Sequence, residues 1–211
     1  MPSAEKYSMS FTSGTLSYYQ SLIIARLYQQ EDDWDTVRKL AVVENRLQTR
    51  TVKTAKTMYR VIASRLKLLD SAEFTLLLNG THSEQTHLLW LAVCRRYRYI
   101  YDFAVEVLRE KYLNLTYELT DDDYWAYFNA KSAWHAEVAN VADSTRKKQR
   151  QVIFKMLKEA ELLTEGRQII PALLTPRLVQ TIAQHNSADL RIYPIDLQDL
   201  SVKLNDPRQN L

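Results

Sequence analysis

Two stretches of the sequence combine many basic side chains with hydroxyl side chains and contain no acid. Residues 45–69 carry seven Lys and Arg, and residues 144–158 carry six. An ordinary solvated helix mixes both charge signs, because opposite charges four residues apart stabilise it. The chemistry that these stretches favour is therefore phosphate binding on double-stranded DNA, and the plain alternative is a pair of solvated faces.

The first stretch would place a basic stripe on one side of a helix. Arg46, Arg50, Lys53 and Arg60 fall within a sector of about 80° when each residue advances by about 100°. Neighbouring threonine hydroxyls could donate to phosphate oxygens, the commonest protein contacts on duplex DNA. The candidate DNA contacts in this stretch are Arg46, Arg50, Lys53, Lys56 and Arg60.

The second stretch reads as the recognition helix of a helix-turn-helix, whose first turns meet the base edges. Its apolar positions run from Val152 to Leu163, and the polar residues gather at the amino-terminal end. The candidate DNA contacts here are Thr145, Arg146, Lys147, Gln149 and Arg150.

Other residue patterns could carry chemistry but predict none. The run RRYRYIYDF at residues 95–103 could stack on single-stranded bases, although its tyrosines suit the edge of a core better. His135 and Glu137 imitate the H-x-E of zinc deaminases, but the downstream P-C-x-x-C is missing. With no nucleophile, base and orienting group in a recognisable arrangement, we expect neither an enzyme nor a cofactor or metal site.

The elements that must position these residues are expected to be helices, since the chain has only 3 Gly and 5 Pro. Apolar spacing predicts helices at residues 15–30, 34–43 and 49–69, the last two joined by a tight polar turn. Residues 34–69 therefore form a helix-turn-helix candidate. A capped helix is expected at residues 73–78, a long one from Ser83 or Thr86 to Tyr112, and another after Thr120.

The last third of the sequence follows a winged-helix order of helix, turn, basic helix, short extended pair and final helix. The extended pair, a β-hairpin, is expected at residues 166–175. The predicted class is thus a mainly all-α bundle with a small winged-helix-like lobe. The predicted domains are a helical lobe at residues 1–118 and the winged-helix-like lobe at residues 119–211.

The amino-acid composition says more about the cellular compartment of the protein than about its binding partner. The net charge of +3 is too small to identify a partner, and the lone Cys94 excludes an internal disulfide. No secretory signal or membrane-spanning stretch is apparent, so we expect a cytoplasmic protein without membrane insertion. The four tryptophans, at positions 34, 90, 125 and 134, fall on apolar positions and are expected in the core.

Several segments spread over residues 7–183 occur in a recognisable order. They are YSMSFTSGTLSYYQSLIIARLY near the amino end, DW at Trp34, NRLQTRT from Asn45, RL at Arg65 and STRKKQRQVIFKMLKEAELL from Ser144. Together they resemble the BrxA family of bacterial BREX phage-defence systems. The resemblance implies a small NusB-like helical protein that binds duplex DNA and supports the other BREX proteins.

Two further interpretations stay open at this point. The basic helices could dock on acidic surfaces of other defence components, which would make the chain a protein-interaction adaptor. The NusB-like arrangement that the resemblance implies could instead belong to an RNA-binding factor.

Overall fold

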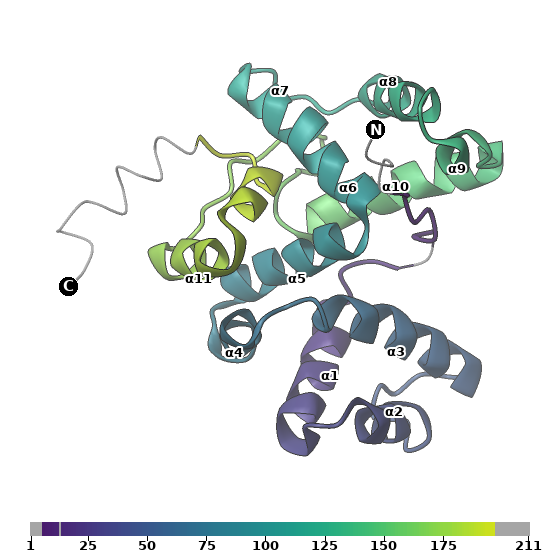
Figure 1. The fold of residues 1–211 in the computed structure, drawn as a ribbon, viewed down its shortest axis with the longest axis vertical. Helices are drawn as coiled ribbons and strands as arrows, with labels where there is room; N and C mark the ends of the chain where they lie inside the picture. Colours follow the sequence, from purple (N-terminus) through teal and green to yellow (C-terminus); the bar gives the residue numbers. More distant parts are fainter. Residues whose placement is uncertain (1–5, 13, 197–211) are drawn as a thin grey trace.

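The computed structural model describes residues 6–12 and 14–196 of the chain, and this part is helical (Figure 1). No strand forms in it, so the all-α class is confirmed. None of its helices has the length and apolar character that crossing a bilayer requires. The NusB-like arrangement stays a prediction. In chain order the elements are α1 (Tyr18–Glu31), α2 (Trp34–Val42), α3 (Val52–Leu66), α4 (Ser71–Asn79), α5 (His82–Arg96), α6 (Arg98–Phe103), the π-helical η1 (Ala104–Arg109), α7 (Glu110–Leu113), α8 (Asp121–Ser132), α9 (Ala136–Ala139), α10 (Asp143–Glu159), α11 (Pro176–Asn186) and the 3₁₀-helical η2 (Ser187–Ile192).

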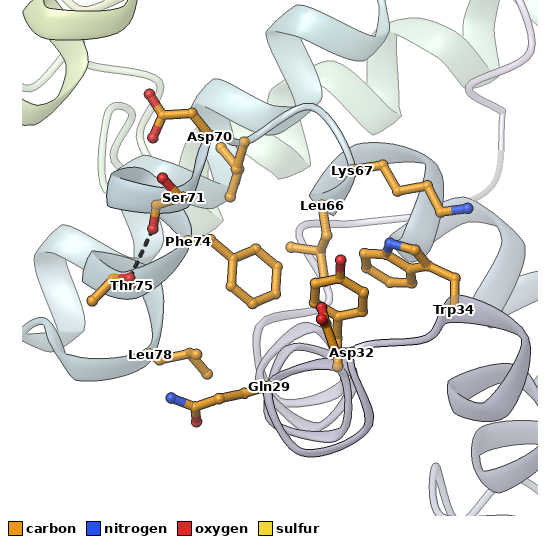
Figure 2. A pocket seen from close by; sticks show the side chains of 12 residues that line it. Gln29, Asp32, Trp34, Leu66, Lys67, Asp70, Ser71, Phe74, Thr75 and Leu78 are labelled. Atoms are coloured by element: carbon orange, nitrogen blue, oxygen red, sulfur yellow. Dashed lines mark hydrogen bonds between the residues drawn. The ribbon is translucent and has the colours of Figure 1, made fainter.

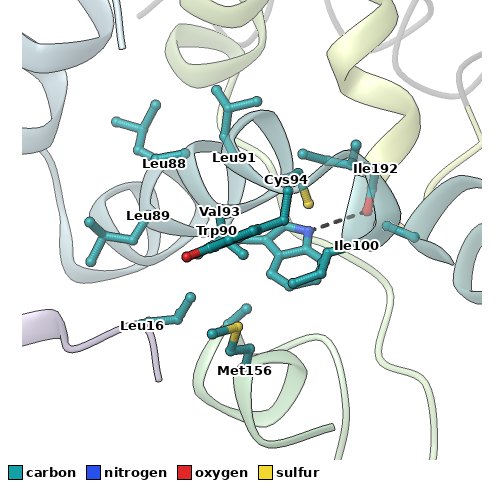
Figure 3. Close-up of a cluster of buried hydrophobic side chains, with 14 of the residues drawn as sticks. Leu16, Leu88, Leu89, Trp90, Leu91, Val93, Cys94, Ile100, Met156 and Ile192 are labelled. Carbon is teal, nitrogen blue, oxygen red and sulfur yellow. Dashed lines mark hydrogen bonds between the residues drawn. The ribbon is translucent and has the colours of Figure 1, made fainter. Parts of the chain in front are cut away.

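Helix α5 lies at the centre of the core and is buried on every side. Its residues from Glu84 to Cys94 are all buried, so no side of this part of the helix faces solvent. Figure 3 shows Trp90 of α5 among side chains from distant elements, including Leu16, Met156 and Ile192. One cluster of buried side chains runs from Tyr7 to Ile195 and holds the fold together. The lobe boundary after residue 118 stays a prediction.

Side-chain caps explain where several helices begin. The side chain of Asp33 accepts the Thr36 N–H at 2.7 Å and starts α2. Capping boxes, in which side chains and backbone N–H groups bond reciprocally, start α4, α5 and α8. The start after Thr120 is confirmed. The N-cap residues of α4 and α5 are Asp70 and Thr81, so both helices begin earlier than predicted.

The long helix predicted up to Tyr112 is wrong as a single element. The backbone leaves helical geometry at Tyr97, with φ −125° and ψ 91°, and the chain continues as α6, η1 and α7. The break turns Tyr97 inward, where its ring lies 5.6 Å from that of Phe11. Tyr97 and Tyr99 are both buried, so neither ring can stack on a nucleic-acid base.

The β-hairpin predicted at residues 166–175, and with it the winged-helix-like lobe, is wrong for the described residues. Ile170 donates its N–H to the Leu162 carbonyl at 3.0 Å. The partner segment cannot extend the ladder, because α10 ends at Glu159 and Glu161, directly before Leu162, has a left-handed φ of 59°. Among the described residues the pairing amounts to two isolated antiparallel bridges, between Glu118 and Gln168 and between Leu163 and Ile169.

The helix-turn-helix candidate also differs in its turn. Helices α2 and α3 pack against each other and against α1. Residues 43–51 connect them, however, whereas a helix-turn-helix uses about three or four residues. The connection is therefore a loop with its own structure rather than a tight turn.

Residues 7–12 and 14–16, called here the amino-terminal strap, cross the core, and α1 begins only at Tyr18 rather than at the predicted residue 15. Phe11 is fully buried and stacks on Tyr99 at 5.7 Å between ring centres. The Tyr7 hydroxyl donates to Asp102 at 2.6 Å, and the Leu16 N–H donates to Glu159 at 2.6 Å. The strap thus joins α6 to α10.

The tryptophans do not share one environment. Trp90 is fully buried, and Trp34 and Trp125 are half-buried against the core. Trp134 lies in the turn after α8, where 86% of it is exposed. The expectation of a core position is wrong for Trp134.

Candidate nucleic-acid interface

The loop between α2 and α3 is held by one asparagine. Asn45 adopts a left-handed φ of 52°, which asparagine tolerates better than most residues. Its side chain accepts the Thr49 N–H at 2.9 Å and donates to the Thr49 carbonyl at 3.1 Å. Buried Leu47 anchors the loop to the core. Arg46 and Arg50 therefore extend from an ordered loop rather than from the helix predicted to begin near residue 49.

Most candidate cations of the first basic stretch are exposed and free of carboxylate partners. Arg50, Lys53, Lys56 and Arg60 are exposed. None of these four forms an ion pair with a carboxylate of the described residues. Arg46 is the exception, because its Nε lies 3.6 Å from Glu44. The side of α3 that carries these cations keeps its positive charge.

Two cations that were not among the candidates extend this surface. A hollow of about 490 Å³ between α2 and α3, called here the basic hollow, is lined by Arg38, Lys56, Arg60 and Lys67 together with the hydroxyls of Thr57 and Ser64. No acid lines it. Charge counting missed Arg38 because it lies in α2 beside Asp35, outside the acid-free stretch.

Arg65 belongs to the first basic stretch but not to its surface. It is only 3% exposed and donates from Nη1 to the Thr15 carbonyl of the strap at 2.7 Å. Desolvation by burial lowers the pKa of Arg65, while the neighbouring Tyr97 raises it. This arginine holds the strap on α3 and cannot contact DNA.

The arginines of the second basic stretch are engaged within the protein. Arg150 pairs with Asp121 at the start of α8, and Arg167 pairs with the same carboxylate at 2.8 Å. Arg146 lies 3.1 Å from Asp143 and donates to the Val141 carbonyl at 2.8 Å. Acids from outside the acid-free stretch therefore neutralise much of its charge.

The remaining candidates in α10 differ in exposure. Gln149 is fully buried and donates to the Met9 carbonyl at 2.8 Å, so it cannot reach a base edge. Thr145 is half-buried. Lys147 and Lys148 are exposed and have no ion pair among the described residues. Gln149 was predicted as a contact because it lies in the first turns of the basic helix, but its side chain faces the strap.

The two basic helices begin toward the same side of the molecule. In Figure 1, α3 and α10 both have their amino-terminal ends at the right of the view, with α3 in the lower part and α10 in the upper part. The side chains of α3 remain open to a ligand, whereas those of α10 are mostly paired. The interface that the geometry favours is therefore centred on α3 and the basic hollow.

Comparison with known proteins gives a consistent result. The family model named BrxA matches residues 5–186. The chain is 29% identical to BREX protein BrxA of Escherichia coli O9:H4 (strain HS) over 155 residues, covering 74% of this chain and 73% of the relative. It is 28% identical to BREX protein BrxA of Bacillus cereus (strain H3081.97) over 149 residues, covering 69% of this chain and 74% of the relative.

A solved structure shares the fold. The crystal structure of an uncharacterized protein from Magnetospirillum magneticum superposes with a TM-score of 0.77 at 20% identity, covering 90% of this chain and all of that one. At this identity the similarity concerns the fold alone. The family match spans most of the sequence, and the two named relatives agree with it. The chain therefore belongs to the BrxA family.

Proposed function

We propose that the chain is a non-catalytic component of a BREX phage-defence system that binds double-stranded DNA in the cytoplasm. The observation that carries the proposal is the open positive surface of α3 and the loop before it, formed by Arg50 of the loop and Lys53, Lys56 and Arg60 of the helix, without carboxylate partners among the described residues. Such cations gain affinity by releasing the counterions that surround DNA phosphates.

We infer that α3 and α10 contribute unequally to DNA binding. The α3 cations and the basic hollow supply most of the binding, and Lys147 and Lys148 of α10 add to it. Arg146 and Arg150 contribute less, because each already has a carboxylate partner. We infer that recognition is mainly of the phosphate backbone, since most cations reach out from exposed side chains.

A gel-shift series with the full chain and a blunt duplex tests the proposal. The double variant Arg50→Glu, Lys53→Glu should bind at least tenfold more weakly than wild type at low salt. For every phosphate that a variant no longer neutralises, the slope of log affinity against log salt should become shallower by about 0.9. A Lys147→Glu, Lys148→Glu variant should lose less affinity.

Arg191→Glu is the matched control, because Arg191 is an exposed cation of η2, away from α3. The proposal fails if wild type has no affinity for the duplex at low salt. It fails equally if the α3 variant loses no more affinity than Arg191→Glu. Duplex RNA of the same sequence, used as a competitor, separates DNA binding from RNA binding.

Docking on other BREX proteins is a second candidate function, favoured by Trp134. A tryptophan that is 86% exposed is unusual on a protein surface, and tryptophan is enriched at the centres of protein interfaces. On this alternative, other BREX proteins co-purify with the wild-type chain even after nuclease treatment. Trp134→Ala abolishes this co-purification and leaves duplex affinity unchanged. Co-purification that disappears with nuclease treatment contradicts it.

A further inference from the structure

A second hollow lies on the other side of Lys67 from the basic hollow, at the junction of α1, α2, α3 and α4. It has a volume of about 430 Å³, within the range of small-ligand sites. Its inner wall is aromatic. The rings of Tyr28 and Trp34 stack with centres 4.2 Å apart, and Phe74 meets Tyr28 edge-on at 5.4 Å. We call it the aromatic hollow (Figure 2).

The rim of the aromatic hollow carries hydrogen-bond acceptors. Asp70 accepts the Glu73 N–H and lies 3.2 Å from His185, so its carboxylate is already engaged. Asp32 is exposed, and its side chain has no hydrogen bond or ion pair among the described residues. In Figure 2 Asp32 is drawn between Phe74 and Trp34. The Asp32 carboxylate is therefore free to meet a ligand, as is the exposed Gln29 amide that also lines the hollow.

Lys67 connects the two hollows because its side chain lines both. Its ammonium group lies 5.1 Å from the centre of the Trp34 ring, and Figure 2 shows it beside that ring. A cation–π contact at an exposed site is weak, so a stronger anionic partner can draw the ammonium group away. The surface is thus polarised, with an aromatic and acidic hollow on one side of Lys67 and a basic hollow on the other.

We propose that the two hollows together bind one nucleotide, with its base in the aromatic hollow and its phosphate in the basic hollow. Aromatic side chains stack on bases of any kind, and clustered cations hold the phosphate. Asp32 accepts a hydrogen bond from an exocyclic amino group, which adenine, cytosine and guanine have and thymine lacks. The ligand is a free nucleotide or an unpaired nucleotide at a DNA end.

The proposal rests on the proposed function only for the second of these sources, because a DNA end reaches the site through the α3 surface. Intact duplex cannot place a base in the aromatic hollow, since its bases are stacked and paired. Binding of blunt duplex by α3 and binding of an unpaired nucleotide by the two hollows can therefore be measured separately.

Tryptophan fluorescence of the full chain provides the test. A Trp134→Phe background removes the most exposed indole, and Trp34 reports on the aromatic hollow. Deoxyadenosine 5′-monophosphate should change the emission saturably, and thymidine 5′-monophosphate should bind several-fold more weakly. Deoxyadenosine and inorganic phosphate, tested alone, should each bind at least tenfold more weakly, since each fills one hollow only. A duplex with one unpaired 5′ adenine, compared with its blunt form, tests the second source.

Two variants locate the site and one controls for charge. Lys67→Met and Asp32→Asn should each lower nucleotide affinity about tenfold, the effect of removing one charge-assisted hydrogen bond. Arg191→Met removes an exposed cation outside both hollows and outside the proposed DNA surface, and it should leave nucleotide affinity unchanged. Thermal melts confirm that all three variants fold. Saturation by the mononucleotide assigns a free nucleotide as ligand, and a response to the unpaired duplex end alone assigns DNA.

Three results would overturn the proposal. The first is no saturable emission change with either the mononucleotide or the unpaired duplex end. The second is inorganic phosphate binding as tightly as the mononucleotide, which would leave no role for the aromatic hollow. The third is equal nucleotide affinity in Lys67→Met and Arg191→Met. The proposed function stands in all three cases if the α3 variant still loses affinity for blunt duplex.

Discussion

At the scale of single residues, Gln149 and Lys147 show how differently two neighbours in α10 are used. Gln149 is fully buried and donates to the Met9 carbonyl of the strap at 2.8 Å. Lys147 is exposed and has no ion pair among the described residues. One side chain therefore serves stability and the other is free to meet phosphate, although both were candidates for the same role.

We expect Gln149→Ala to lower stability and Lys147→Ala to lower duplex affinity. Gln149→Ala removes a fully buried side chain that holds a partly buried carbonyl, and it should lower the free energy of unfolding by about 1–3 kcal/mol. It should leave duplex affinity unchanged at a temperature where the variant is folded. Lys147→Ala should weaken duplex binding and leave stability within about 0.5 kcal/mol of wild type. Urea melts and gel shifts on both variants measure the two effects, and reduced duplex affinity in folded Gln149→Ala would contradict the assignment.

At the scale of elements, the burial of α5 on all sides makes it costly to place a positive charge on His87. His87 lies in the middle of α5 and is 3% exposed. Desolvation by burial lowers its pKa from 6.5 to about 4, so the ring is neutral in the folded protein at neutral pH. Once unfolded, the same ring regains its ordinary pKa. The core of the bundle is therefore built for a neutral imidazole.

This environment predicts a loss of stability in mild acid. Above pH 6.5 the ring is neutral in both states and contributes no pH dependence. As pH falls from 6.5 toward 4, the unfolded chain binds a proton that the folded chain does not, so the free energy of unfolding decreases. Between pH 7 and pH 5 the decrease from His87 should be about 2 kcal/mol.

Urea melts at pH 7 and pH 5 check this expectation. His87→Leu should lose less stability than wild type over the same interval, because the proton-binding site is absent from its unfolded state. The other histidines are common to both proteins and cancel in the comparison. An equal loss of stability in wild type and His87→Leu would show that another group causes the acid sensitivity.

At the scale of the whole molecule, the amino-terminal strap joins helices that lie far apart in the sequence. Arg65 of α3 donates to the Thr15 carbonyl, Glu159 of α10 accepts the Leu16 N–H, and Tyr7 donates to Asp102 of α6. Phe11 packs between these contacts against Tyr97 and Tyr99. The strap thus positions α3, the centre of the proposed DNA surface, relative to the rest of the fold.

Phe11→Ala should therefore destabilise the whole molecule rather than its amino end alone. Deleting a fully buried phenylalanine ring costs about 3–5 kcal/mol. We expect one cooperative transition at a lower urea midpoint, because one core cluster includes both the strap and α5. Ser10→Ala is the matched control, since Ser10 is exposed in the same segment. A separate early transition that spares the α5 core would contradict this account.

Local patterns in the sequence were enough to predict the helical class, most helix positions and the family. Scarce glycine, apolar residues at helical spacing and caps such as Asp33 and Thr120 are local signals, and each acts within a few residues. The exposed cations Arg50, Lys53, Lys56 and Arg60 were found in the same way, because alternation of apolar and polar positions predicts which side of a helix is solvated. Whether these cations bind DNA stays a prediction.

Which charges remain free and which residues share a site depends on how the helices pack. Asp121 pairs with Arg150, which lies 29 residues away in the sequence. The Thr15 carbonyl accepts a hydrogen bond from Arg65, which lies 50 residues away. The wing was expected from segment order alone, yet the end of α10 directly before Leu162 leaves the pairing no room to extend. Arg38, Lys67 and Asp32 line two neighbouring hollows because α1, α2, α3 and α4 pack there. Charge and packing act through space, and local sequence patterns do not contain those distances.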